Sequence, residues 1–254
     1  MPSVPSSPSL YLFDLDDTLF DHSLTCRAAL DEVRRTEPRF AARSLDELWH
    51  SYEERLNAND LTLGSVGHPA RFYEEARAAR FRALASTVGW NCDAAEARAI
   101  SYLYRKQYLR LRRPVPGAVE FVRRMAHTAP VGIVTNNQVA EQVEKLNFLG
   151  LSETVHHLTI SEAVGVAKPD PAIFQAALHE AGVGPREAVM VGNSWTDDVL
   201  GARAAGIRPV WFNRFGRSRP TRHNVAEITS FRPASTAEQT VRGAASGRRT
   251  RRRH

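Results

Sequence analysis

Short apolar runs alternate with amphipathic stretches over most of the second half of the chain, and a similar apolar run stands at 10–13. This pattern constrains the fold more than any other feature. It predicts strands at 10–13, 131–137, 155–160, 188–193, 208–213 and 226–229, and helices at 117–126, 141–149, 171–181 and 197–205. Strands that alternate with helices are typical of a parallel sheet with right-handed crossovers, covered by helices on both faces. The sequence therefore predicts an α/β fold built on a parallel sheet.

Residues 21–113 have a different texture, rich in Arg, Glu and Ala, with apolar residues along one side of each expected helix. The pattern predicts helices at 24–35, 44–57, 69–88 and 93–112. Capping boxes are expected at Ser44 with Glu47 and at Asp93 with Glu96. We therefore expect a helical bundle at 21–113, inserted into a core made of residues 10–20 and 114–232.

The positive charge of the chain is concentrated at its end. Residues 242–254 carry six arginines and no acid, so the formal net charge of +6 belongs to this segment and the rest is near zero. We expect residues 1–9 to be disordered, and residues 233–254 to form a basic disordered tail. Such a tail can bind polyanions weakly, but it predicts no specific nucleic-acid partner.

Three features of the sequence indicate the cellular compartment: the length of its apolar runs, its first residues and its cysteines. No apolar run approaches the roughly 20 residues needed to span a bilayer, and the first residues lack the pattern of a secretory signal. The only cysteines, Cys26 and Cys92, are not spaced as metal ligands. These features predict a cytoplasmic protein with no membrane partner, and they leave the oligomeric state open.

Polar residues gather where the predicted strands end. The first strand leads to Asp14, Asp16, Asp17 and Thr18, the second to Thr135, Asn136 and Asn137, the third to the loop of Lys168, and the fourth to Asn193, Ser194, Asp197 and Asp198. Parallel α/β sheets bind ligands at the carboxyl ends of their strands. We therefore expect these loops to converge on one site. The other two lysines, Lys106 and Lys145, lie in helical patterns and are expected to be solvated.

Acidic residues brought so close together repel one another, and burying them costs several kcal/mol unless a positive charge lies between them. A divalent cation can hold Asp14, Asp16 and the fourth loop together. Mg²⁺ suits this site because it prefers few carboxylates, several waters and a phosphate oxygen. The residues thus predict a Mg²⁺ site that faces a phosphorylated substrate.

The same residues predict a division of chemical roles. Asp14 can attack phosphorus and form an aspartyl-phosphate, while Asp16 protonates the leaving oxygen and later deprotonates the attacking water. Lys168 and the Thr135 hydroxyl can hold the phosphoryl oxygens. Asn136 and Asn137, which follow Thr135, are candidate substrate-binding residues.

Four stretches in this order, "FDLDDTLF", "VTNN", "AKPDP" and "VGNSWTDDVLGA", resemble the motifs of the haloacid dehalogenase-like hydrolase superfamily. The resemblance covers 10–231. It implies a Rossmann-like core, a mobile helical cap of the first type, Asp14 as nucleophile and Asp16 as general acid/base. It also implies Thr135 and Lys168 as phosphate holders. The implied Mg²⁺ ligands are Asp14, the backbone carbonyl of Asp16 and the first position of the fourth motif.

That first position departs from the family pattern, which usually has Asp where this chain has Asn193. The amide oxygen can ligate Mg²⁺ but carries no charge, and Asp197 or Asp198 can compensate; we take Asp198 as a further metal candidate. Asp16 favours a phosphatase over a dehalogenase, because an ester oxygen needs a proton to leave whereas a halide does not. The expected function is hydrolysis of a small phosphorylated metabolite. A sugar phosphomutase and a catalytically weak binding or regulatory protein on the same scaffold stay open as alternatives.

Overall fold

The computed structural model describes residues 8–62, 70–221 and 223–245, apart from the side chains of 56–62, 70–72 and 245. Its contacts divide the chain into two compact units. One is a core unit formed by Met1–Phe20 and Pro114–His254, and the other, Asp21–Arg113, is a helical insert. The insert occupies the residues at which the sequence predicts one, and its role as a cap stays a prediction.

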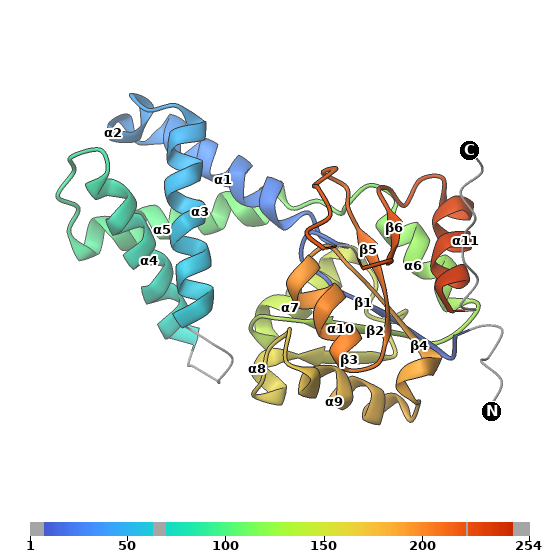
Figure 1. Cartoon of the computed structure of the whole chain (residues 1–254). Coiled ribbons are helices and arrows are strands. Elements are labelled where there is room, and N and C mark those ends of the chain that lie inside the picture. Colours follow the sequence, from blue (N-terminus) through green and yellow to red (C-terminus); the bar gives the residue numbers. More distant parts are fainter. Residues whose placement is uncertain (1–7, 63–69, 222, 246–254) are drawn as a thin grey trace. The chain divides into compact units, whose positions relative to one another are not determined.

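The core unit is built on a six-stranded sheet in the order β3-β2-β1-β4-β5-β6 (Figure 1). Every neighbouring pair of strands is parallel. The strands are β1 (Leu10–Phe13), β2 (Val131–Thr135), β3 (His157–Ile160), β4 (Ala188–Gly192), β5 (Arg208–Phe212) and β6 (Ala226–Ile228). The predicted α/β fold is confirmed, and β1 lies between β2 and β4, so that their carboxyl ends are neighbours.

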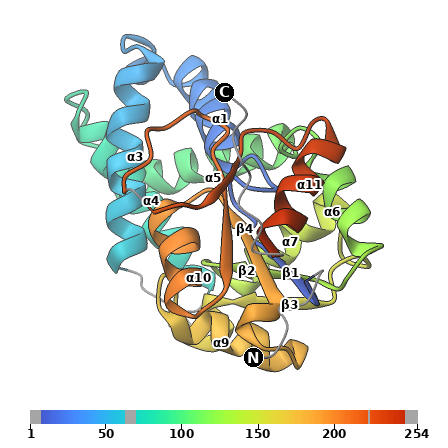
Figure 2. The ribbon, with the colours of Figure 1, turned by 45° about the vertical axis from the view of Figure 1, so that its right-hand side comes forward.

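Helices cover both faces of this sheet (Figures 1 and 2). α6 and α11 contact one face, and α9 and α10 contact the other. The helices of the core unit are α6 (Ala118–Ala126), α7 (Val139–Leu149), α8 (Ser161–Val164), α9 (Pro171–Ala181) and α10 (Gly201–Ala204), with a 3₁₀ turn η1 (Pro185–Glu187), a π-helix η2 (Trp195–Leu200) and α11 (Ala234–Ala245).

The apolar residues of β1 explain why it is the central strand. Successive side chains of a strand point to opposite faces. Leu10 and Leu12 accordingly belong to the cluster that contains Phe174 of α9, while Phe13 packs edge-on against Phe121 of α6, with ring centroids 6.1 Å apart. Burying each such side chain contributes roughly 1.5–3 kcal/mol. β1 is thereby fixed from both faces, and so is the residue that follows it.

The helical insert consists of α1 (His22–Thr36), α2 (Pro38–Ala41), α3 (Leu45–Thr62), α4 (Ala70–Ser86) and α5 (Ala94–Leu111). The capping box of Asp93 and Glu96 is present, as predicted, at the start of α5. The rings of Tyr52, Phe81 and Tyr104 pack together in the interior, with centroids 5.2 to 5.6 Å apart. The insert therefore has an apolar core of its own.

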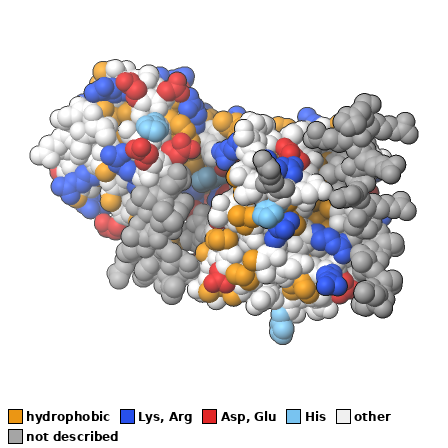
Figure 3. All heavy atoms as spheres, in the orientation of Figure 1, with side chains coloured by type: hydrophobic (Ala, Val, Ile, Leu, Met, Phe, Trp, Pro, Cys, Tyr) orange, Lys and Arg blue, Asp and Glu red, His pale blue; other side chains and the backbone are white. Residues whose placement is uncertain are grey.

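Charges of both signs are interspersed over the face of the insert seen in Figure 3. Within the described ranges, no helix combines the length and the apolar character that crossing a membrane requires.

Both segments that the sequence predicts to be disordered include ordered residues next to the core. Pro8 is buried, and the backbone N–H of Ser9 donates to the Glu187 carbonyl at 2.7 Å. The prediction of disorder from 233 is wrong up to residue 245, because α11 buries Ala237 and Val241 against the core. Glu238 on the same helix pairs with Arg124 of α6 at 2.5 Å. The predictions for 1–7 and 246–254 lie outside the described residues.

Candidate active site

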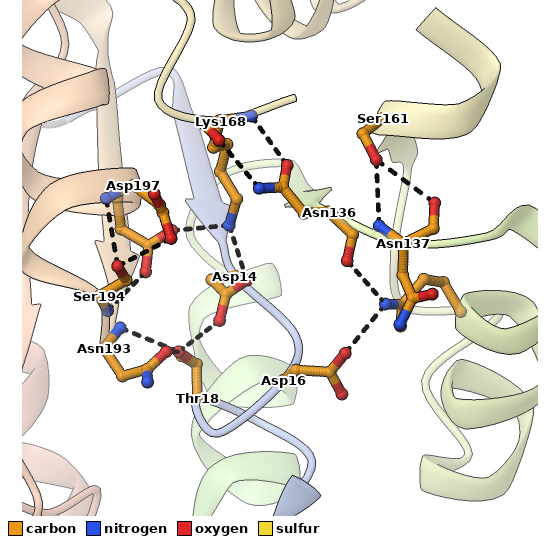
Figure 4. A network of polar contacts seen from close by, with 12 residues as sticks. Asp14, Asp16, Thr18, Asn136, Asn137, Ser161, Lys168, Asn193, Ser194 and Asp197 are labelled. Carbon is orange, nitrogen blue, oxygen red and sulfur yellow. Dashed lines mark hydrogen bonds and ion pairs between the residues drawn. The ribbon is translucent and has the colours of Figure 1, made fainter. Parts of the chain in front are cut away.

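The predicted site lies at the carboxyl ends of the central strands. Asp14 follows β1, Thr135 ends β2, Asn193 follows β4, and Lys168 comes from the loop between α8 and α9. Figure 4 shows Asp14, Thr18, Lys168 and Asn193 pointing toward one another. Residues up to 179 positions apart in the sequence thus meet in one polar cluster, because parallel strands end at the same edge of the sheet.

Lys168 joins two carboxylates at the centre of this cluster. Its Nζ lies 2.7 Å from Asp14 Oδ1 and 2.6 Å from Asp198 Oδ1, and all three side chains are buried. Desolvation alone would lower the pKa of Lys168, but the two carboxylates outweigh it and raise that pKa. Lys168 is therefore a permanent positive charge beside Asp14.

The other oxygen of Asp14 is held by Thr18, whose hydroxyl donates to Asp14 Oδ2 at 2.8 Å. Burial raises the pKa of the Asp14 carboxyl to about 7; Lys168 acts against this rise, and the neighbouring Asp198 adds to it. A buried carboxylate in this position is oriented on both oxygens and has lost most of its hydration. Such a group is well placed to act as a nucleophile once a cation compensates its charge.

Asp198 reaches the cluster because of the local backbone around β4. It lies in the π-helix η2, and the backbone N–H of Ser194 donates to its Oδ2 at 2.8 Å. A Cβ atom at Gly192 would overlap the Asp198 carboxyl group, so only glycine fits there. Both Asp198 oxygens are thus engaged, one by Lys168 and one by Ser194. Its predicted role as a metal ligand stays a prediction.

The side chain of Asn193 provides a test of the predicted cation site. The amide atom that faces the cluster lies 3.1 Å from the Asp16 carbonyl oxygen and 3.2 Å from Asp14 Oδ2. As a nitrogen, this atom donates to both; as an oxygen, it accepts from the Thr18 hydroxyl at 3.1 Å and lies beside the two acceptor oxygens, as a third oxygen ligand of one cation would. Adjacent ligand oxygens of an octahedral Mg²⁺ are about 2.9 Å apart, given metal–oxygen distances of about 2.0–2.1 Å.

The residues present therefore fit a small divalent cation, held by Asp14, the carbonyl of Asp16 and the amide oxygen of Asn193. No group of three or more His, Cys, Asp or Glu side chains in the part of the chain that the structure describes forms a metal site.

Thr135 and the two asparagines after it differ in their surroundings. The Thr135 hydroxyl is buried and has no hydrogen-bond partner among the described residues. The Asn136 side chain instead holds the loop of Lys168, accepting from the Lys168 backbone N–H at 2.8 Å and donating to its carbonyl at 3.0 Å. The backbone N–H of Asn137 donates to Ser161 Oγ at 3.0 Å, on the side away from Asp14 (Figure 4). Their predicted contacts with substrate stay predictions.

Asp16 is paired with a residue expected to be solvated. Lys145 Nζ lies 2.7 Å from each Asp16 oxygen, and Gln142 Nε2 donates to Asp16 Oδ2 at 3.0 Å. The prediction of a solvated Lys145 is wrong, because its side chain is only 4% exposed. Lys106, by contrast, is exposed, as expected.

Four residues of this network had no assigned role in the sequence analysis. Thr18 orients Asp14, Ser194 orients Asp198, and Gln142 and Lys145 bind Asp16. The position of Thr18 directly after the acidic run was a usable signal. Gln142 and Lys145 carried a weaker signal, since each lies four residues before a leucine, Leu146 and Leu149, on what the spacing predicts to be the buried face.

A family model described as haloacid dehalogenase-like hydrolase matches residues 8–206 of this chain. The chain belongs to this family. The resemblance of its four motifs to that superfamily is thereby confirmed.

Similar proteins agree with this assignment. A phosphoserine phosphatase from Thermus thermophilus is 32% identical over 224 residues, 81% of this chain and 88% of that protein. The pyrimidine 5'-nucleotidase YjjG from Escherichia coli is 42% identical over 108 residues, 42% of this chain and 48% of that protein. The magnesium-bound HAD-hydrolase YfnB from Bacillus subtilis has a TM-score of 0.71 at 22% identity, over 91% of this chain and 98% of that one. At this identity the likeness shows the fold.

Proposed function

We propose that this chain is a Mg²⁺-dependent phosphatase that hydrolyses a small phosphorylated metabolite through an aspartyl-phosphate on Asp14. The observation that carries the proposal is the buried contact of 2.7 Å between Lys168 and Asp14, whose second oxygen is bound by Thr18. Two relatives with phosphatase or nucleotidase names support the same reaction class. The organic part of the substrate is left open.

Two groups of the chain are suited to bind the phosphoryl group. Lys168 supplies a positive charge, and the buried Thr135 hydroxyl has an unused donor. Hydrogen bonds from a charged donor to phosphate are roughly twice as strong as neutral ones. Together they would hold phosphorus in line with Asp14, which is the positioning and charge stabilisation that phosphoryl transfer depends on.

The reaction then takes place in two halves. In the first, an Asp14 oxygen forms a bond to phosphorus, the bond to the leaving oxygen breaks, and Asp16 gives that oxygen a proton. In the second, Asp16 takes a proton from water, whose oxygen attacks phosphorus and breaks the bond to Asp14. Positioned proton transfer of this kind contributes roughly 10²–10⁴-fold. Inorganic phosphate leaves, and both aspartates return to their starting state.

Mg²⁺, when bound, supplies charge that stabilises the transferred phosphoryl oxygens and the Asp14 carboxylate. The chain's own residues hold two of the expected ligand residues in place. Thr18 orients Asp14, and Trp211 Nε1 donates to the Asn193 carbonyl at 3.1 Å.

The proposal is tested by measuring phosphate release from phenyl phosphates and from a panel of phosphorylated metabolites, with Mg²⁺ and with EDTA. Asp14→Asn should abolish release, because an amide cannot attack phosphorus. Asp46→Asn, an exposed carboxylate of the insert, is the matched control and should leave the rate unchanged.

Purified protein that releases no phosphate from any compound with Mg²⁺ present would rule the proposal out. So would an Asp14→Asn variant that keeps the wild-type rate.

A further inference from the structure

Two side chains of α7 bind Asp16, and neither takes part in the reaction described above. Lys145 Nζ lies 2.7 Å from both Asp16 oxygens, and Gln142 Nε2 lies 3.0 Å from Oδ2. Residues three apart on a helix project from the same face. These two donors thus come from the same helix, which belongs, like Asp16, to the core unit.

Folding alone does not explain a lysine at position 145. Its side chain is 4% exposed, and its ammonium lies 5.6 Å from the centre of the Phe20 ring. Leu146 and Leu149, on the same side of α7, are buried apolar residues. A buried ammonium costs several kcal/mol unless it is paired, and an apolar side chain is often at least as stable in such a place. The position therefore points to a function of the lysine.

The orientation of Gln142 leads to the same conclusion. Its side chain is fully buried, and Nε2 donates both to Asp16 Oδ2 and to the Asn136 carbonyl, the latter at 3.2 Å. Its Oε1 has no hydrogen-bond partner in the described part of the chain. A buried acceptor without a partner costs about 1–3 kcal/mol. The amide is thus oriented to donate to Asp16, although its own oxygen stays unsatisfied.

The backbone around Asp16 leaves the side chain as the adjustable part. Backbone N–H groups of Leu19 and Phe20 both donate to the Leu15 carbonyl at 2.9 Å, and that of Asp17 donates to the Phe20 carbonyl at 2.7 Å. This closed turn fixes where the Asp16 side chain starts. The donors on α7 then bind its carboxyl group.

We propose that Lys145 and Gln142 are positioning residues for Asp16, which place its carboxyl group for proton transfer and stabilise it once the proton has left. The inference rests on the proposed phosphatase function. When Asp16 protonates the leaving oxygen, it becomes a carboxylate whose two oxygens accept from Lys145 and Gln142. Lys145 acts only through Asp16 and touches neither phosphorus nor the leaving group.

The test uses two substrates of similar size that differ in their need for a proton. Phenyl phosphate releases a basic phenolate, which needs a proton, whereas dinitrophenyl phosphate releases a stable anion that does not. Lys145→Met should lower kcat for phenyl phosphate about 10²-fold, the effect of misplacing a catalytic group by about 1 Å. Its kcat for dinitrophenyl phosphate and both KM values should stay near the wild-type values.

Further variants separate positioning from a structural role. Lys145→Arg should restore much of the phenyl phosphate rate, because it keeps a positive donor. In an Asp16→Asn background, Lys145→Met should cause no further loss. Lys106→Met, at an exposed lysine of the insert, is the matched control and should behave as the wild type.

An equal loss on both substrates, or the same loss with and without Asp16, would overturn the proposal in favour of a structural role. A wild-type rate on phenyl phosphate in Lys145→Met would also overturn it, while leaving the proposed phosphatase intact. A wild-type enzyme inactive on every phosphate compound would instead reject the proposed function and this inference together.

Discussion

At the scale of single residues, the site is a balance of buried charges. Asp14 and Asp198 carry two negative charges and Lys168 one positive, while Asp16 and Lys145 cancel each other. When Asp14, Asp16 and Asp198 are all ionised, these five side chains together have one net negative charge before any cation binds. An aspartate in place of Asn193 would make it two. The neutral amide thus lowers the repulsion in the free protein, and it lowers the attraction for a cation as well.

This balance predicts the effect of Asn193→Asp. The added carboxylate faces Asp14 and the Asp16 carbonyl at about the spacing of adjacent Mg²⁺ ligands, so the affinity for Mg²⁺ should rise by about tenfold or more. Without Mg²⁺, the variant should unfold at a lower temperature than the wild type. Calorimetric Mg²⁺ titration and thermal unfolding with and without Mg²⁺ measure both effects.

Asn147→Asp, on the exposed face of α7, adds the same charge away from the site and is the control. If Asn193→Asp bound Mg²⁺ no more tightly than this control, the assignment of Asn193 as a ligand would be wrong.

The buried Thr135 hydroxyl predicts a substitution that weakens substrate binding without lowering the stability of the fold. Its buried hydroxyl has no partner among the described residues, so Thr135→Val removes an unsatisfied polar group at nearly constant shape. The melting temperature should stay the same or rise. KM for a phosphate ester should increase about tenfold or more, because a hydrogen bond to a charged group contributes about 1.5–3 kcal/mol.

Thr159 on β3 offers a matched control, since its hydroxyl is also buried and also lacks a partner in the described residues. Thr159→Val should change stability in the same direction and leave KM unaltered. A Thr135→Val variant that binds substrate as well as the wild type would contradict the role of Thr135 as a phosphate holder.

At the scale of elements, the sequence predicts the helices and strands, which depend on periodicity, but it misses contacts that depend on packing between distant segments. The strands and crossover helices were predictable because their apolar periods differ, and the convergence of Asp14 with Lys168 follows from parallel strand ends. The contact of Lys145 with Asp16 was not, because 129 residues separate the two and helical spacing does not identify a partner.

The terminal helix α11 shows the same limit. Its sequence includes Ser235, Thr236, Thr240 and Gly243, which have modest helix propensity, and a charged segment follows it. Tertiary packing supplies what propensity lacks, since most helical stability in proteins comes from an apolar face buried against neighbours. For α11 this face includes the buried Ala237 and Val241, and the helix contacts β4, β5, β6 and α6. The composition of this segment could not show that the core offers an apolar surface for α11 to pack against.

At the scale of the whole molecule, the predicted site residues all belong to the core unit. Asp14, Thr18, Lys168 and Asn193 all belong to it, and so does α7 with Lys145. The two chain connections to the insert lie side by side, because Phe20 and Pro114 form an antiparallel bridge and the backbone N–H of Val115 donates to the Leu19 carbonyl at 2.9 Å. The insert can therefore be replaced without stretching the core.

This arrangement predicts that a chain with residues 22–112 replaced by a short Gly/Ser linker folds on its own. The connection then has the length of an ordinary loop of about 4–6 residues. It should unfold cooperatively, gain stability on adding Mg²⁺, and hydrolyse dinitrophenyl phosphate in a reaction that Asp14→Asn abolishes. Selectivity among phosphorylated metabolites should be lost, because a cap that closes over an active site selects its substrate and the insert is the expected cap. Circular dichroism with thermal unfolding, followed by phosphate release, measures each point. A shortened chain that unfolds without cooperativity would show that the core depends on the insert for its stability.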